Sequence, residues 1–242
     1  MKNVSETYWV DHSQKARGAV AKYLPYYIEA CARHPSMVLP QEFRPRVEAL
    51  VFHYAGFLPY HPGGRSNMFN GLMPVLALMA SVHVTLREEG WTVDQIGRLT
   101  YEAFYERFMK MPAVLRRIMH TFMTSRLFSG MMRKPCVAMS SSGREDTFDL
   151  EYTYSPDPCP TTTMQCSRCG MISFMHRAEL TEMYAYCNMF DFAQADAFGL
   201  GLVQPACIGR GDKACAYHFT RDGGDTQYPS SVRRILGTDM EM

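Results

Sequence analysis

The sequence predicts an α+β fold, with a mainly helical N-terminal half packed on a small antiparallel sheet with helices. Two observations lead to this prediction. Apolar residues recur at helical spacing up to about residue 130, whereas short alternating segments separated by turn residues follow Pro135. We expect a helical region at residues 1–134, a cysteine-rich α+β region at 135–222 and a polar C-terminal arm at 223–242, which together form one integrated domain.

The helical half is expected to hold several helices, because its apolar residues repeat every three to four positions. Thr92 followed by Gln95 predicts a capping box, and Gly90 is a typical residue after a helix end. Residues 57–67 contain two prolines and a Gly-Gly pair, so they should form a loop, either a pocket wall or a plain connection. The helices are expected over residues 11–32, 42–57, 67–89, 92–108 and 112–130.

The C-terminal half is expected to combine short strands with one long helix. Helical spacing predicts a helix from Arg177 to Phe198, with Gly199 after its end. Alternation and turn residues predict the strands, and the polar tail after Arg221 should be an extended surface arm. The expected strands are residues 136–140, 147–154, 201–208 and 214–220, the first two joined by the turn Ser-Ser-Gly-Arg-Glu-Asp.

The composition argues against several partners. The chain has 25 basic and 24 acidic residues and no sustained basic run, so we expect no nucleic-acid partner. The N-terminal segment lacks the apolar run of a secretory signal, which favours a cytoplasmic location. The apolar segment 71–84 is too short to span a bilayer, so we expect no membrane partner. The densest group of basic residues is interpreted as a solvated helix face; it consists of Arg116, Arg117, Arg126, Arg133 and Lys134.

The cysteines are concentrated in the C-terminal half. Six of the eight lie within the 57 residues from Cys159 to Cys215. Because a reducing location disfavours structural disulfides, we expect free thiols or metal thiolates. Cys166 and Cys169 form a C-x-x-C motif, which suits zinc sites and, less well outside a βαβ context, redox dithiols. The alternative zinc site would use Cys166, Cys169, Cys207 and Cys215, with Cys187 and His218 as further candidates.

Cys187 and Asp191 are four residues apart in the long predicted helix. Positions i and i+4 share a helix face, so both side chains could project into one pocket. A carboxylate there could take the thiol proton or deliver one to a leaving group. The alternative interpretation is a buried cysteine beside a solvated aspartate.

The run from Cys169 to Phe219 has a distinctive pattern. A cysteine opens a helix, an acidic residue precedes Leu, a Cys and an Asp stand one turn apart, and a strand hairpin follows with a Gly-Asp-x-x-Cys turn. This run of about 50 residues resembles the C-terminal half of the L-2-amino-thiazoline-4-carboxylic acid hydrolase family. The matching residues are Cys169, Glu179, Leu180, Cys187, Asp191, Gly211, Asp212 and Cys215, followed by Tyr217 and Phe219.

A more distant similarity is to 4-vinyl reductase-type sensor domains, in which cysteines of a terminal hairpin hold a zinc ion. Cys207 and Cys215 match the end of that pattern. Gln204 stands where an acid is expected, which argues against a zinc site of that kind.

The family resemblance implies a hydrolase that opens or cleaves a C–N bond of a cyclic amidine or related small heterocycle. A thiolate can add to the carbon of a protonated amidine, and an acid can protonate the departing nitrogen. We expect Cys187 or Cys169 as the nucleophile, Asp191 as acid/base and Cys215 beside them, with no cofactor. The residues expected to contact a small-molecule substrate are Arg65, His83, Glu179 and His176.

Other interpretations stay open at this point. His83 lies on an apolar helix, where a hydrogen-bonded core histidine is more common than a substrate contact. The protein could instead be a non-catalytic small-molecule sensor or carrier with a structural zinc site, or a metal or redox enzyme. The polar arm could reach a second subunit, so a homo-oligomer is also open.

Overall fold

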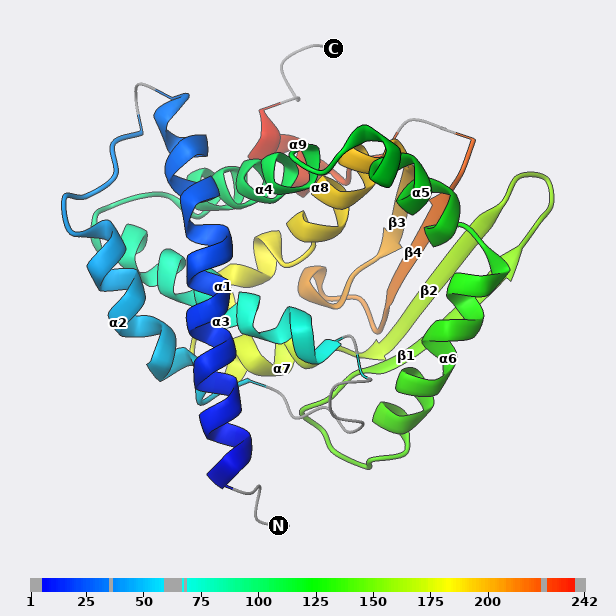
Figure 1. Cartoon of the computed structure of the whole chain (residues 1–242), viewed down its shortest axis with the longest axis horizontal. Coiled ribbons are helices and arrows are strands. Elements are labelled where there is room, and N and C mark those ends of the chain that lie inside the picture. The colour runs from blue at the N-terminus through cyan, green and yellow to red at the C-terminus, as the bar shows by residue number, and fades with distance from the viewer. Residues whose placement is uncertain (1–5, 35–36, 59–66, 68, 223–225, 238–242) are drawn as a thin grey trace.

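The computed structural model describes residues 6–34, 37–58, 67, 69–222 and 226–237. It confirms an α+β fold in which a mainly helical N-terminal region precedes a four-stranded antiparallel sheet with interspersed helices (Figure 1). The N-terminal helices are α1 (Glu6–Ala32), α2 (Phe43–Ala55), α3 (Phe69–Glu88), α4 (Val93–Met109), α5 (Ala113–Met123) and α6 (Arg126–Ser140). The remaining elements are β1 (Asp149–Ser155), β2 (Thr161–Arg168), α7 (Gly170–Arg177), the 3₁₀ helix η2 (Thr181–Tyr186), α8 (Met189–Phe198), β3 (Gly201–Ala206), the 3₁₀ helix η3 (Ile208–Arg210), β4 (Cys215–Thr220) and α9 (Ser230–Leu236).

Helices α3 and α4 lie at the centre of the helical half. By length and composition α3 could cross a membrane, but 83% of its most apolar window is buried inside the protein, as in a core helix. The predicted capping box of α4 is confirmed, because Gln95 N donates to Thr92 Oγ1 over 3.2 Å and Thr92 N donates to Gln95 Oε1 over 2.8 Å. Helix α8 packs on α4 and also touches β3, so it joins the helical half to the sheet (Figure 1).

The sheet has the strand order β1-β2-β4-β3, with every neighbouring pair antiparallel. Its inner face is apolar and carries two cross-strand rows. One row is Leu150, Cys166 and Cys215, and the next is Tyr152, Met164 and Tyr217. The outer face carries mostly polar residues, as expected for an antiparallel sheet with one face in water.

Two predictions around residues 112–140 are wrong. The expected helix 112–130 is two helices, because Ser125 ends the first and caps the second by accepting from Phe128 N. The expected strand 136–140 is instead the end of α6, and the predicted turn 141–146 follows that helix. Cys136 and Met139 are buried there, continuing a helical spacing that begins at Phe128. Five residues of apparent alternation were too few to outweigh that longer periodicity.

The C-terminal half differs from prediction in three places. Strand β2 was not predicted, since its threonine-rich sequence lacks apolar alternation. The expected helix 177–198 is interrupted, because Glu179 adopts a positive φ of 58° and a 3₁₀ segment follows. The expected extended arm contains α9, which packs on α4 and buries Val232 and Ile235. The strands expected at 201–208 and 214–220 are confirmed as β3 and β4.

The contact of α9 and η2 with α4 depends on Gly97. A Cβ at this position would lie 3.0 Å from Tyr186 Cβ and 3.2 Å from Ile235 Cγ2. We expect Gly97→Ala to lower the free energy of unfolding by on the order of 1 kcal/mol, because overpacking outweighs the gain in helix propensity. A Cβ on Gly130, in α6, would have no atom within 4 Å. Gly130→Ala should therefore raise the free energy of unfolding slightly. Urea unfolding of both variants measures these changes in the free energy of unfolding. A change of the same sign in both variants would contradict the prediction.

Candidate active site

Five cysteines from separate elements converge at one end of the inner sheet face. The register of β2 and β4 sets Cys166 opposite Cys215. Cys207 follows β3, and its Sγ lies 3.8 Å from Cys187 Sγ. Cys169, at the start of α7, interacts with both Cys166 and Cys207. We call these five residues the thiol cluster. None of them forms a disulfide.

The turn between β3 and β4 fits closely against the cluster. A Cβ on Gly209 would lie 2.9 Å from Cys187 Sγ and 2.9 Å from the Tyr184 carbonyl oxygen, so a glycine is needed there. Ile208 N donates to Cys215 Sγ over 3.2 Å. Asp212 holds the other side of the turn by accepting from Cys207 N over 2.7 Å. The glycine-rich turn therefore brings Cys207 between two other thiols.

Cys169 has the features of a reactive thiol. It is partly exposed and is the residue before the first turn of α7. The Cys166 thiol lowers the pKa of Cys169 most; burial opposes this, and the backbone amides of Ile172 and Met171 lower it further.

Cys166 is the protonated member of this pair. It is buried, and its Sγ donates to the Arg168 carbonyl oxygen over 3.1 Å, which requires a thiol proton. Its interaction with Cys169 and its burial both raise the pKa of Cys166. The two thiols of the C-x-x-C motif therefore differ: Cys166 is a hydrogen-bond donor with a raised pKa, and Cys169 has a lowered pKa.

Cys207 is a second site of negative charge. Interactions with Cys187 and then Cys215 lower the pKa of Cys207 to about 3, aided by the Gly209 amide and the charge of Arg210. The same interactions raise the pKa values of Cys187 and Cys215, which stay protonated. Cys207 is only 1% exposed, so its thiolate is shielded from reagents.

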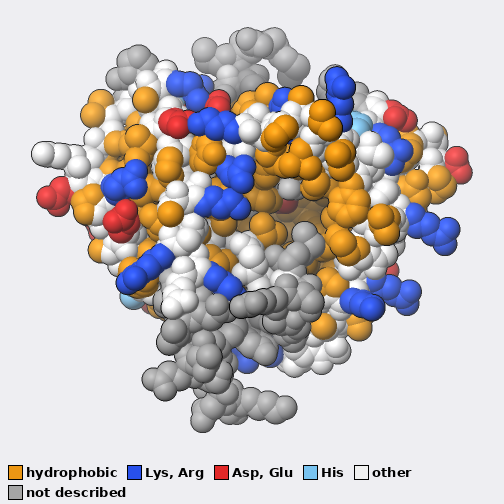
Figure 2. Space-filling view, in the orientation of Figure 1, with side chains coloured by type: hydrophobic (Ala, Val, Ile, Leu, Met, Phe, Trp, Pro, Cys, Tyr) orange, Lys and Arg blue, Asp and Glu red, His pale blue; other side chains and the backbone are white. Residues whose placement is uncertain are grey.

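Asp191 lies in the first turn of α8 and faces the cluster. Burial raises the pKa of Asp191 to about 7, although the Tyr217 hydroxyl against the carboxyl lowers it, and the charge of Cys207 adds to the rise. Asp191 nevertheless keeps part of its surface exposed. Asp191 therefore lies deep in the protein without being fully enclosed. Figure 2 shows a hollow between α8 and the sheet, lined by hydrophobic side chains, with acidic atoms in its depth.

Cys187 and Asp191 do not share one helix, in contrast to the predicted pairing. Cys187 is the residue after η2, whereas α8 begins at Met189. Tyr217 interacts with the charges of both residues, so they still face the same region. Sequence reasoning missed Tyr217 as the partner of Asp191, although its position two residues after Cys215 on a strand placed both on one face.

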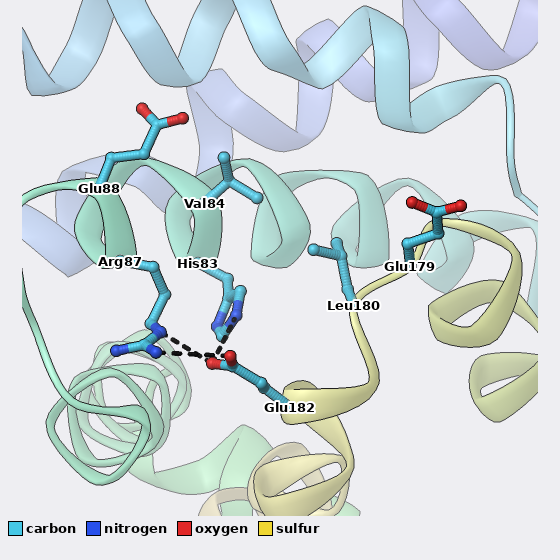
Figure 3. A pocket seen from close by; sticks show the side chains of 7 residues that line it. All are labelled: His83, Val84, Arg87, Glu88, Glu179, Leu180 and Glu182. Carbon is cyan, nitrogen blue, oxygen red and sulfur yellow. Dashed lines mark hydrogen bonds and ion pairs between the residues drawn. The ribbon is translucent and has the colours of Figure 1, made fainter.

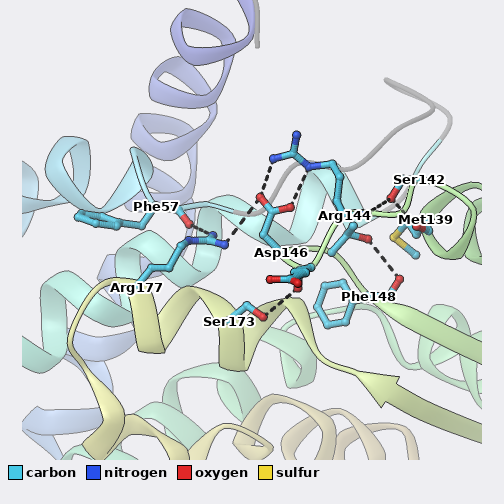
Figure 4. Close-up of polar contacts among 10 residues, drawn as sticks. Phe57, Met139, Ser142, Arg144, Asp146, Phe148, Ser173 and Arg177 are labelled. Carbon is cyan, nitrogen blue, oxygen red and sulfur yellow. Dashed lines mark hydrogen bonds and ion pairs between the residues drawn. The ribbon is translucent and has the colours of Figure 1, made fainter. Parts of the chain in front are cut away.

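A network of polar contacts holds the end of α7, where Arg177 lies. Figure 4 shows Asp146, in the loop before β1, accepting from Arg144 and facing Arg177, with Asp146 Oδ1 2.8 Å from Arg144 Nε. Burial alone would raise the pKa of Asp146, but the Arg144 hydrogen bond and the charges of both arginines outweigh it and lower this pKa. Arg177 also donates to the Phe57 carbonyl oxygen. Cys169 therefore stands on an anchored helix.

Two of the predicted substrate-binding residues lie elsewhere. His83 and Glu179 line an open pocket of about 320 Å³ that none of the cysteines lines (Figure 3). His83 is buried, with Nδ1 2.7 Å from the Tyr186 hydroxyl, and burial lowers its pKa to about 4, as expected of a neutral core histidine. His176 is exposed near the end of α7, and Arg65 lies outside the described residues.

The described residues include all eight cysteines, and within them no three Cys, His, Asp or Glu side chains are grouped so that they could hold a metal ion. The alternative zinc site through Cys166, Cys169, Cys207 and Cys215 therefore lacks a ready set of ligands. The thiol cluster is better described as a network of thiol donors and thiolate acceptors.

Comparisons with known proteins add no assignment to this geometry. No family model matches the chain, and neither a curated protein nor a solved structure matches it. The resemblance to the thiazoline carboxylate hydrolase family therefore stays a prediction from the residues that carry it.

Cys169 is expected to be the most reactive thiol. At neutral pH, iodoacetamide should modify Cys169 about tenfold faster or more than Cys159, which is also partly exposed but lies outside the cluster. Cys166→Ala should slow modification of Cys169, because the variant removes the main group that lowers its pKa. Peptide mass spectrometry over time measures both rates. Equal rates at Cys159 and Cys169 would contradict the assignment.

The pKa of Asp191 should appear in the pH dependence of stability. The native carboxyl holds its proton up to about pH 7, and an unfolded aspartate loses it near about pH 4. Stability should therefore fall as pH rises through this range. Asp191→Asn should match the wild type near about pH 4 and exceed it by on the order of 2 kcal/mol at about pH 8.

Melting temperatures across this pH range measure the effect. Asp94→Asn is the control, because Asp94 is an exposed carboxylate that pairs with Arg234. A constant offset between Asp191→Asn and the wild type at every pH would mean that the carboxyl does not titrate in this range.

Proposed function

We propose that this protein is a hydrolase that opens or cleaves a C–N bond of a cyclic amidine or a related small heterocycle. In this proposal Cys169 is the nucleophile and Asp191 is the acid/base. The observation that carries it is that the partly exposed Cys169 thiol, whose pKa is lowered, and the Asp191 carboxyl, whose pKa is about 7, both interact with Cys207. A group with a pKa near the working pH can both give and take a proton.

The proposed reaction uses one water molecule. The Cys169 thiolate adds to the amidine carbon, and the ring C–N bond breaks as protonated Asp191 gives its proton to the departing nitrogen. Water then adds to the resulting thioimidate carbon and loses a proton to the Asp191 carboxylate. As the remaining hydroxyl proton passes to the departed amine, the C–S bond breaks, which releases an amide and restores the Cys169 thiolate.

Negative charge at the site favours a substrate that is a cation or becomes one by taking up a proton. Cys207 and Cys169 both favour the thiolate form, and Asp191 becomes negative as it loses its proton. Such a pocket attracts a cation, and a protonated amidine is a planar cation with an electrophilic carbon. The structure favours Cys169 over Cys187 as nucleophile, because burial and Cys207 keep Cys187 protonated.

Turnover of a panel of cyclic amidines and thiazolines tests this proposal. Mass spectrometry should detect a product heavier by one water. We expect Cys169→Ala to reduce kcat by about 1,000-fold or more and Asp191→Asn by about 100-fold or more. Cys159→Ala, outside the cluster, should keep full activity. The proposal fails if Cys169→Ala retains wild-type turnover, or if no member of the panel is opened and no adduct forms on Cys169.

A further inference from the structure

Helices α5 and α6 expose an unusual number of apolar side chains. Only Met123 of α5 is fully buried, and Met119 and Phe122 pack partly buried against the core. The apolar side chains left on the surface by the two helices are 41–71% exposed; they are Val114, Leu115, Ile118, Leu127, Met131 and Val137. Surface apolar residues that gather in this way mark an interaction site.

The same two helices are basic. Residues 107–144 contain eight Lys and Arg residues and no Asp or Glu. Four of them, Arg117, Arg126, Arg133 and Lys134, are exposed, and no carboxylate in the described part of the chain pairs with them. We call these four cations and the six exposed apolar side chains the α5–α6 face. Figure 2 shows hydrophobic side chains over α5, beside the hollow, with Lys and Arg along the adjoining edge.

We propose that the α5–α6 face docks on the surface of an anionic lipid bilayer. An amphipathic helix lies in the bilayer interface when its apolar side enters the headgroup region and flanking Lys and Arg meet anionic lipids. Helix α5 has this arrangement, since Val114, Leu115 and Ile118 lie on one side and Arg117 on another. The proposal concerns attachment to the surface and is independent of the hydrolase proposal.

Charge argues against a second copy of this chain as the partner. In a two-fold dimer the same patch meets itself, so the four unpaired cations of one copy would approach those of the other. Like charges brought together across an interface cost free energy, whereas anionic headgroups would neutralise them. Four of the five cations predicted to form a solvated helix face would thus contact anionic headgroups; they are Arg117, Arg126, Arg133 and Lys134.

Vesicle flotation with the full chain tests this docking. We expect binding to phosphatidylcholine vesicles that contain phosphatidylglycerol, no binding to pure phosphatidylcholine, and loss of binding at high salt. Ile118→Asp with Leu127→Asp should weaken binding about tenfold or more. Arg117→Glu with Arg133→Glu should do the same, because it removes the attraction to the headgroups.

Matched variants and a mass measurement decide between outcomes. Val38→Asp changes a side chain that is 77% exposed outside this face, and Arg44→Glu changes an exposed cation of α2. Both should bind vesicles like the wild type, and all variants should melt like the wild type. Absence of binding to anionic vesicles, or equal loss in Val38→Asp, would overturn the proposal. So would a dimer by light scattering that Ile118→Asp with Leu127→Asp converts to a monomer.

Discussion

The antiparallel pairing of β2 with β4 is the constraint on which the candidate site depends. It sets Cys166 opposite Cys215 and Met164 opposite Tyr217, so the C-x-x-C segment lies beside the hairpin that carries Cys207. Because side chains alternate along a strand, a slip of one residue would turn Cys166 away from the inner face. The apolar burial of that face therefore secures the register, and the register assembles the thiols and places Tyr217 against Asp191.

The thiol cluster separates charge through interactions among its own thiols. Neighbouring thiols lower two pKa values. Cys166 lowers the pKa of Cys169, and Cys187 and Cys215 lower the pKa of Cys207. Backbone amides add to this at the start of α7 and in the turn after β3. Exposure then distinguishes the two residues, since Cys207 is enclosed and Cys169 is partly exposed. Within this cluster, a lowered pKa and an accessible sulfur therefore coincide at Cys169.

Residue patterns predicted the fold class, the capping box of α4 and the last two strands, because each has a strong local signal in periodicity or turn chemistry. They also placed Cys169, Cys187, Cys215 and Asp191 in one region. They could not assign roles to these residues, because protonation depends on contacts between strands far apart in sequence. The broken helix after Arg177 was equally hidden, since Glu179 adopts a positive φ without the glycine that usually marks such a position.

Helix α9 has a consequence for how the chain folds during synthesis. Its Arg234 pairs with Asp94 at the start of α4, across 140 residues of sequence, and its Ile235 packs over Gly97. The surface of α4 on which α9 packs therefore stays exposed while the residues of the sheet and the thiol cluster are synthesised. Contacts between such distant segments form late and slow folding. We expect the helical half to exist first as a loosely closed intermediate, which becomes native only when α9 docks.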